Sequence, residues 1–353
     1  MKTSYIFPIL LMLVFITACR QQQKKTDRDQ LIGAGKMPNL AGDNDGNFYI
    51  VYGSHDSILF ASSHDKGESF SIPELVTVLP ELSAASMRGP QIASTTSGIV
   101  IIACNKSGNI YSYAKDASGN WSKPVKVNDA DTVAKEQFMA LGADGNNVFA
   151  VWLDLRGNKR NKIVGSGSSD GGKTWSKNLL VYVSPDSSVC ECCKPSVAIR
   201  GGNVYVMFRN WLRGNRDMYL IESSDGGESF GEAKRLGVNS WALNGCPMDG
   251  GGLTINNNAV VQTVWRRKDS IYSCEPGQKE TTIGTGRGCT LETVNNKNVY
   301  AWTENGDIIV RKPQGMKINL GKGQLPLLKR INDEHLLCVW ENDKQIYARI
   351  LSL

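Results

Sequence analysis

One eight-residue pattern recurs along the chain at a nearly constant spacing, and this repeat constrains the fold more than any other feature. The pattern Ser-x-Asp-x-Gly-x-x-aromatic occupies 63–70, 168–175 and 223–230. A damaged copy at 116–121 keeps the Asp, a Gly and the Trp. The four aspartates lie 51, 54 and 55 residues apart. Because a period of about fifty residues indicates stacked similar units, we expect a repeat architecture.

The residues of the pattern suit a tight turn between strands. Asp accepts hydrogen bonds from backbone N–H groups just downstream, and Gly adopts the positive φ that other residues resist. We therefore interpret Asp65, Asp170 and Asp225 as turn residues rather than catalytic acids. Prolines open several units at a similar period, since Pro38 to Pro90 and Pro195 to Pro247 both span 52 residues.

The repeat resembles the Asp-box, or bacterial neuraminidase repeat, of the sialidase-like β-propellers. This resemblance covers nearly all of 31–353 and implies one all-β domain of four-stranded antiparallel blades joined by Asp-box turns. Counting strand-like units predicts seven blades, with six as the fallback if two short units merge. The seventh unit lacks an outer strand, which the segment Leu31 to Lys36 is expected to supply, so that the ring closes without an exposed edge.

The first residues indicate export. An apolar run from Ile6 to Ile16 is too short for a stable membrane span and ends in Ile16-Thr17-Ala18-Cys19, which resembles the bacterial lipobox. We expect a signal peptide at 1–18, lipidation of Cys19 and a polar tether at 19–30. The expected location is the cell envelope, lipid-anchored on the periplasmic side of the outer membrane. The net charge of +6 is dispersed, which argues against nucleic acid.

Nine cysteines form the second informative feature. Cys19 is assigned to lipid, and Cys104 and Cys338 lie in apolar strand runs as core residues. The remaining six allow up to three disulfides in an oxidising compartment. The run Cys190-Glu191-Cys192-Cys193 is unusual, because neighbouring cysteines do not bond each other without strain.

Several of these sulfur residues precede the opening strands of their units, and in a propeller such positions surround one mouth of the channel. Cys193 and Cys246 lie 53 residues apart, one repeat length, and we expect their sulfurs to meet as a disulfide or at a shared metal. A soft-donor site would favour copper, as Cu(I), ahead of zinc. Structural disulfides with packing methionines are the alternative. The candidate metal ligands are Cys190, Cys192, Cys193, Cys246, Cys289 and Met248.

The resemblance to sialidases implies a second function, a glycoside hydrolase of exo-sialidase type acting on sialylated or related glycans. Such enzymes bind a carboxylate through three arginines and use a Tyr nucleophile with an acid/base Asp. The candidates here are Arg88, Arg209, Arg287, Tyr272 and Asp154. The usual first-arginine motif is replaced by Met87-Arg88-Gly89-Pro90, so enzymatic activity does not follow from the motifs.

Two classes of function therefore remain. One is a membrane-anchored binding protein that takes a small molecule, a glycan or a soft metal ion at a Cys-rich mouth, and the other is the sialidase-type enzyme. The segments 209–211, 215–217 and 244–250 exceed what blades require. We place the functional site there, on the side of units four and five.

Overall fold

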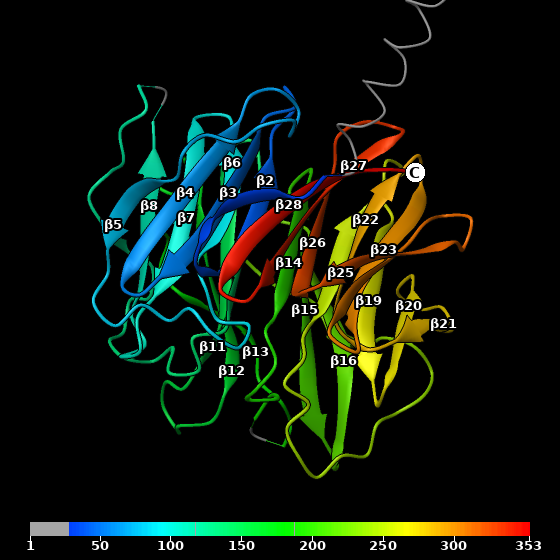
Figure 1. Cartoon of the computed structure of the whole chain (residues 1–353). Helices are drawn as coiled ribbons and strands as arrows, with labels where there is room; N and C mark the ends of the chain where they lie inside the picture. The colour runs from blue at the N-terminus through cyan, green and yellow to red at the C-terminus, as the bar shows by residue number, and fades with distance from the viewer. Residues whose placement is uncertain (1–27, 117, 187) are drawn as a thin grey trace, which may run out of the picture.

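Seven four-stranded antiparallel sheets form a ring in the computed structural model, which describes residues 28–116, 118–186 and 188–353 (Figure 1). Each sheet is one blade, and its first strand contacts the first strands of both neighbouring blades. The chain is therefore a seven-bladed β-propeller, as the repeat predicted. The predicted signal peptide, Cys19 and the tether up to residue 27 lie outside the described residues. Within the described part, no helix is long and apolar enough to cross a membrane.

The blades follow the chain, each running from an inner strand to an outer one. Blade 1 contains β2 (Lys36–Gly42), β3 (Phe48–Ser54), β4 (Ser57–Ser63) and β5 (Glu74–Val78). Blade 2 contains β6 (Gln91–Thr95), β7 (Gly98–Cys104), β8 (Ile110–Lys115) and β9 (Val125–Lys126). Blade 3 contains β10 (Met139–Asp144), β11 (Asn147–Asp154), β12 (Lys162–Ser168) and β13 (Leu179–Tyr182). Blade 4 contains β14 (Ser196–Arg200), β15 (Asn203–Leu212), β16 (Asn215–Ser223) and β17 (Lys234–Arg235).

The remaining blades close the ring. Blade 5 contains β18 (Gly251–Ile255), β19 (Val261–Arg267), β20 (Ser270–Cys274) and β21 (Thr281–Thr285). Blade 6 contains β22 (Arg287–Val294), β23 (Lys297–Glu304), β24 (Asp307–Arg311) and β25 (Lys317–Lys322). Blade 7 contains β26 (Gln324–Arg330), β27 (His335–Asn342), β28 (Gln345–Ser352) and, as its outer strand, β1 (Gln30–Ala34).

The N-terminal strand completes the last blade. β1 pairs antiparallel with β28, with Gln30 opposite Ala348 and Leu31 opposite Tyr347. This confirms the predicted closure, although the strand ends at Ala34 and Lys36 already belongs to blade 1. Joining the two ends of the domain in one sheet leaves β28 without an exposed edge.

The repeated turns connect the third and fourth strands of their blades and share one hydrogen-bond pattern. In each of the three intact copies, one Asp carboxylate oxygen accepts the hydroxyl of the Ser two residues before it and a backbone N–H four residues on. Asp225, for example, accepts from Ser223 Oγ at 2.6 Å and from Ser229 N at 3.0 Å. The second Gly packs against the preceding blade, since a Cβ on Gly227 would lie 2.6 Å from Phe149 Cε2. The predicted turn role is therefore confirmed.

The inner strands begin at one end of the ring, opposite the repeated turns. Six of the seven are entered through a residue with positive φ, namely Met37, Met87, Gln137, Met248, Gly288 and Leu325. The end of the ring where they lie is called the mouth face below. It also carries the hairpin turns between second and third strands. Large side chains such as Trp152, Trp265, Trp302 and Trp340 fill the blade interiors and are fully buried.

Candidate functional site

Four cysteines meet on the mouth face, and we call them the cysteine cluster: Cys190, Cys192, Cys193 and Cys246. The first three lie in the connection from β13 to β14, and Cys246 lies in the next such connection, from β17 to β18. Cys192 and Cys246 form a disulfide with a Cα–Cα distance of 6.1 Å. The equivalent loops of adjacent blades thus come together, as the repeat spacing predicted.

The pairing differs from the expected one, which joined Cys193 to Cys246. A turn at 191–193 brings Cys193 back towards Cys190, so that their Sγ atoms lie 3.4 Å apart. Cys192 lies 3.6 Å from Cys190, Sγ to Sγ, and is the member that reaches the neighbouring loop. Cys190 and Cys193 are free thiols, and both are buried. Cys246, in contrast, is exposed.

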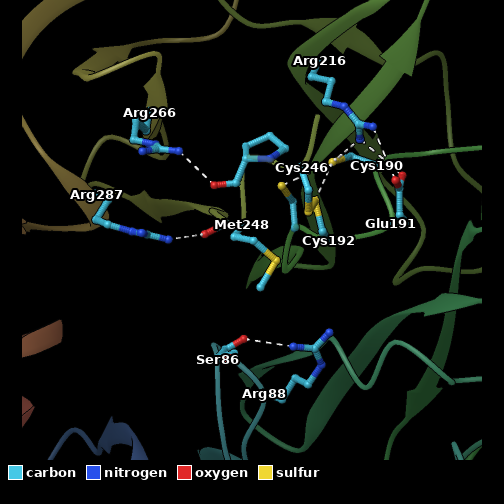
Figure 2. The surroundings of a disulfide bond; sticks show 12 residues. Ser86, Arg88, Cys190, Glu191, Cys192, Arg216, Cys246, Met248, Arg266 and Arg287 are labelled. Carbon is cyan, nitrogen blue, oxygen red and sulfur yellow. Dashed lines mark hydrogen bonds and ion pairs between the residues drawn. A yellow bond between two sulfur atoms is a disulfide. The ribbon is translucent and has the colours of Figure 1, made fainter. Parts of the chain in front are cut away.

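Two arginines of blade 4 set the charge around Cys190. Arg216 Nη1 donates to Cys190 Sγ at 3.0 Å and forms an ion pair with Glu191 at 3.2 Å (Figure 2). The pKa of Cys190 is lowered to about 6, mainly by its hydrogen bond with Cys193, which outweighs the effect of burial. The Cys192 N–H, Arg209 and Arg216 lower this pKa further. Burial and the neighbouring Cys190 raise the pKa of Cys193. These contacts favour the thiolate form of Cys190 over that of Cys193.

The two outlying members of the predicted metal set lie differently. Met248 packs against the cysteine cluster, and Figure 2 shows its side chain beside the disulfide. Cys289 instead belongs to an apolar cluster with Val264, Leu291 and Trp302. Cys274 lies in the core between blades 4 and 5, and Cys104 and Cys338 are buried in strands. Among the described residues one disulfide forms, rather than three.

The predicted arginines lie on the mouth face but do different work. Arg209 is 2 % exposed and donates to the backbone carbonyls of Arg216 and Arg266, so it links the backbones of blades 4 and 5. Arg287 donates to the carbonyl of Met248 at 3.0 Å and is exposed. Arg88 lies over the Phe138 ring, 4.1 Å from its centroid. Figure 2 shows Arg287 reaching the Met248 carbonyl and Arg88 beside Ser86, on the other side of the Met248 side chain.

The other two predicted catalytic residues, Asp154 and Tyr272, interact with neighbouring arginines. Asp154 is fully buried, forms an ion pair with Arg156 at 2.9 Å and accepts from Trp152 Nε1. Tyr272 lies on the third strand of blade 5, with the Arg267 guanidinium 4.1 Å from its ring centroid. The structure therefore brings Arg88 and Arg287 towards one space but does not add Asp154 or Tyr272 to them as a free acid and nucleophile.

Open space on this face has three connected parts. A channel of about 650 Å³ runs between the inner strands of all seven blades. Lys194 lines it, donates to Gln91 Oε1 at 2.7 Å, and has a pKa lowered to about 8 by burial. At the mouth lies a pocket of about 450 Å³ that contains Met37, Met87, Met248 and Arg287, and Met37 lines both spaces.

The third part is a cleft of about 1040 Å³ beside the mouth, over blades 7, 1 and 2. We call it the cationic cleft, because four cations line it: Lys36, Arg88, Lys106 and Lys344. Within the described residues, none of the four forms an ion pair. Asp56 is the one carboxylate among the described residues that line it. The cleft shares Lys36, Ala85 and Ser86 with the mouth pocket, so the two are continuous.

Sequence reasoning missed the cationic cleft, apart from Arg88. Its lysines come from a strand start and two hairpin turns that are far apart along the chain. Each is an ordinary surface lysine in the sequence, and only the closure of the ring places Lys344 of blade 7 beside Lys36 of blade 1. The one signal in the sequence was that all three lysines lie at strand ends or turns on the mouth face.

Comparison with known proteins supports the architecture. No protein-family profile and no curated protein matches the sequence. Among solved structures, the chain is similar to an alpha-L-arabinanase of Penicillium chrysogenum complexed with arabinobiose, at TM-score 0.56 and 12% identity, over 92% of this chain and 97% of that one. A lectin of Burkholderia pseudomallei is similar at TM-score 0.64 and 9% identity, over 92% and 97%.

An ulvan lyase bound to a GlcA(1-4)Rha3S unit is similar at TM-score 0.55 and 11% identity, over 93% of this chain and 95% of that one. At such low identities the likeness concerns the fold. It places the chain among β-propellers whose structural neighbours include glycoside hydrolases, a lyase and a lectin.

Proposed function

We propose that the cationic cleft binds an acidic oligosaccharide, one that carries carboxylates or sulfates. The observation that carries this proposal is a set of four cations in one cleft, none of which forms an ion pair among the described residues. Like charges gathered in a concave surface repel one another, and an anionic ligand relieves that repulsion while gaining from the focused field. The cleft's volume is in the range of ligand sites.

The connection to the mouth extends this site. An oligosaccharide in the cleft can reach the mouth pocket past Lys36, where Arg287 adds a fifth cation. Arginine recognises carboxylate and sulfate groups through paired N–H donors, and lysine adds a point charge. The structural neighbours bound to sugars, including one bound to a GlcA(1-4)Rha3S unit, support a saccharide over other polyanions.

Binding is favoured over hydrolysis by the same residues. Most glycoside hydrolases use two carboxyl groups on either side of the bond that breaks. The described lining of the cleft offers Asp56, and the mouth pocket adds only Glu341, which accepts the Met37 N–H at 2.8 Å. The exo-sialidase alternative would also need Tyr272 and Asp154 at the ligand, whereas they are engaged with Arg267 and Arg156. We therefore propose a binding protein for acidic glycans.

The test is calorimetric titration with a GlcA(1-4)Rha3S oligosaccharide, with neutral arabinobiose as the comparison ligand. We expect affinity for the acidic sugar alone, weakening as salt rises. The double variant Lys36→Ala/Lys106→Ala should lose affinity by roughly tenfold, since each solvent-screened pair contributes up to about 1 kcal/mol. Lys297→Ala, at the start of β23 on the opposite face, should bind normally. Equal binding of both sugars, or an unaffected double variant, would contradict the proposal.

A second ligand is favoured by a separate observation at the cysteine cluster. The Sγ atoms of Cys190, Cys192 and Cys193 all lie within 4.8 Å of one another, and Met248 packs against them. A tetrahedral site with metal–sulfur bonds of about 2.3 Å has sulfur–sulfur edges of about 3.8 Å. The observed Cys190–Cys193 separation of 3.4 Å, Sγ to Sγ, is close to that edge.

We infer that this cluster can bind a soft metal ion, copper as Cu(I) ahead of zinc. With the disulfide present, Cys190 and Cys193 supply two sulfurs and Met248 a thioether, a donor set that favours Cu(I). The check is a Cu(I) titration against a competing chelator, together with elemental analysis of protein purified without chelators. Cys190→Ser should abolish tight binding, and the buried, distant Cys104→Ser should not. A wild-type protein that never competes with the chelator would remove this candidate.

A further inference from the structure

The disulfide of the cysteine cluster is exposed at one end and buried at the other. Cys246 lies in an exposed loop segment with Asn244 and Gly245, whereas Cys192 is 5 % exposed. An external thiolate can therefore approach Cys246 but not Cys192. Attack on one sulfur of a disulfide releases the other as a thiolate, so the geometry fixes which sulfur is attacked and which leaves.

A guanidinium lies in the same cluster as the leaving sulfur, and a positive charge stabilises a thiolate. Cys190 Sγ lies 3.6 Å from Cys192 Sγ, within sulfur hydrogen-bond distance. Arg216 donates to Cys190 Sγ at 3.0 Å, which places a guanidinium in the same cluster. A better-stabilised leaving thiolate departs faster. A disulfide that served only as a cross-link would gain nothing from two free thiols and a cation beside it.

We propose that the cysteine cluster carries out reversible thiol–disulfide exchange with a peptide dithiol, with Cys246 as the sulfur that the partner attacks. A partner thiolate bonds to Cys246 Sγ, the Cys192–Cys246 bond breaks, and its electron pair leaves on Cys192. The partner's second thiolate then attacks its own sulfur in the mixed disulfide and releases Cys246. The partner ends as a disulfide, two electrons have passed to the protein, and each released cysteine takes a proton from solvent.

The reverse direction uses the same atoms. In the reduced protein, Cys246 is the exposed nucleophile that attacks a partner disulfide, and Cys192 resolves the mixed disulfide. Cys190 and Cys193 take no part in bond exchange and remain on the buried side of the cluster, beside the Arg216 guanidinium. This activity depends on neither the oligosaccharide nor the metal, so its failure leaves both of those proposals standing.

The experiment uses a short synthetic peptide with two cysteines separated by two residues, under anaerobic conditions with a metal chelator. Mass spectrometry after alkylation follows both molecules. We expect the wild-type protein to oxidise one peptide per chain and to gain two alkylated cysteines, Cys192 and Cys246. Arg216→Ala should slow this by roughly tenfold, the effect of losing one charge-assisted hydrogen bond in the cluster. Cys104→Ala should match the wild type.

A trapping variant keeps the test independent of rates. In Cys192→Ser the resolving thiol is absent, so incubation with the oxidised peptide should leave a mixed disulfide on Cys246. Circular dichroism and thermal melting show whether each variant is folded. If the native wild-type disulfide resists the peptide and reacts only in denaturant, or if the trapped peptide is on another cysteine, the disulfide is a structural cross-link and the proposal fails.

Discussion

Gly227 gives the sharpest test of how the repeated turns hold the blades together. Its φ is +94° and the missing Cβ would lie 2.6 Å from Cε2 of Phe149, a side chain that is 1 % exposed in the preceding blade. In Gly227→Ala, the left-handed backbone costs roughly 1–2 kcal/mol. Forcing a methyl group against a packed ring adds about 1–3 kcal/mol. We therefore expect a loss of about 3 kcal/mol in the free energy of unfolding.

The neighbouring glycine is the matched control. Gly226 also has positive φ, at +79°, but a Cβ there would meet nothing within 4 Å. The first copy of the turn has Lys66 at this position with φ of +61°, so a side chain is tolerated. Gly226→Ala should cost about 1 kcal/mol, the backbone part alone. Urea unfolding followed by tryptophan fluorescence measures both, and equal losses in the two variants would refute the contact between blades as the cause.

Three further outcomes are expected. Burial would raise the pKa of Glu280, but hydrogen bonds from the Val238 N–H, Arg267 and Asn239 lower it to about 2. The ionised Glu280 therefore stabilises the folded protein fully above about pH 4.5, and this contribution is lost as the pH falls through about 2. The stability difference between wild type and Glu280→Gln, measured by urea unfolding, should therefore shrink from about 3 kcal/mol at neutral pH towards zero near pH 2. Ultraviolet titration should show a thiolate step near pH 6 that disappears in Cys190→Ser. Removal of β1 should lower the melting temperature and reduce hydrogen-exchange protection of those β28 amides that face β1, because β28 keeps its pairing with β27.

The fold could be predicted from the sequence because the repeat carries it. Each turn copy fixes one end of a blade, and the second strands are apolar runs that read as buried, as Trp152 and Trp302 show. Blade number then follows from the period, and closure by β1 follows from the missing outer strand of blade 7. These are local sequence signals repeated at a fixed spacing, and such signals are the easiest to recognise in a single sequence.

The candidate site was harder to predict from the sequence, because its geometry depends on the direction of individual side chains within turns. The period predicted that the loops of Cys193 and Cys246 meet, but a single residue decided the bond, since the turn at 191–193 sends Cys192 outwards and Cys193 back to Cys190. Asp154 and Tyr272 could not be assigned for the same reason. Whether an Asp is free or paired with a neighbouring Arg156 does not follow from strand periodicity.

The entries to the inner strands show why the cysteine cluster belongs to blade 4. Five non-glycine residues, Met37, Met87, Gln137, Met248 and Leu325, take positive φ at the mouth, at roughly 1–2 kcal/mol each in other contexts. This geometry recurs because it turns the chain from an outer strand to the next inner one. Blade 4 alone among the described entries has no such residue and enters through the turn that contains Cys192 and Cys193. There the disulfide links the entries of blades 4 and 5 instead, so we expect its reduction to loosen the entry to blade 4.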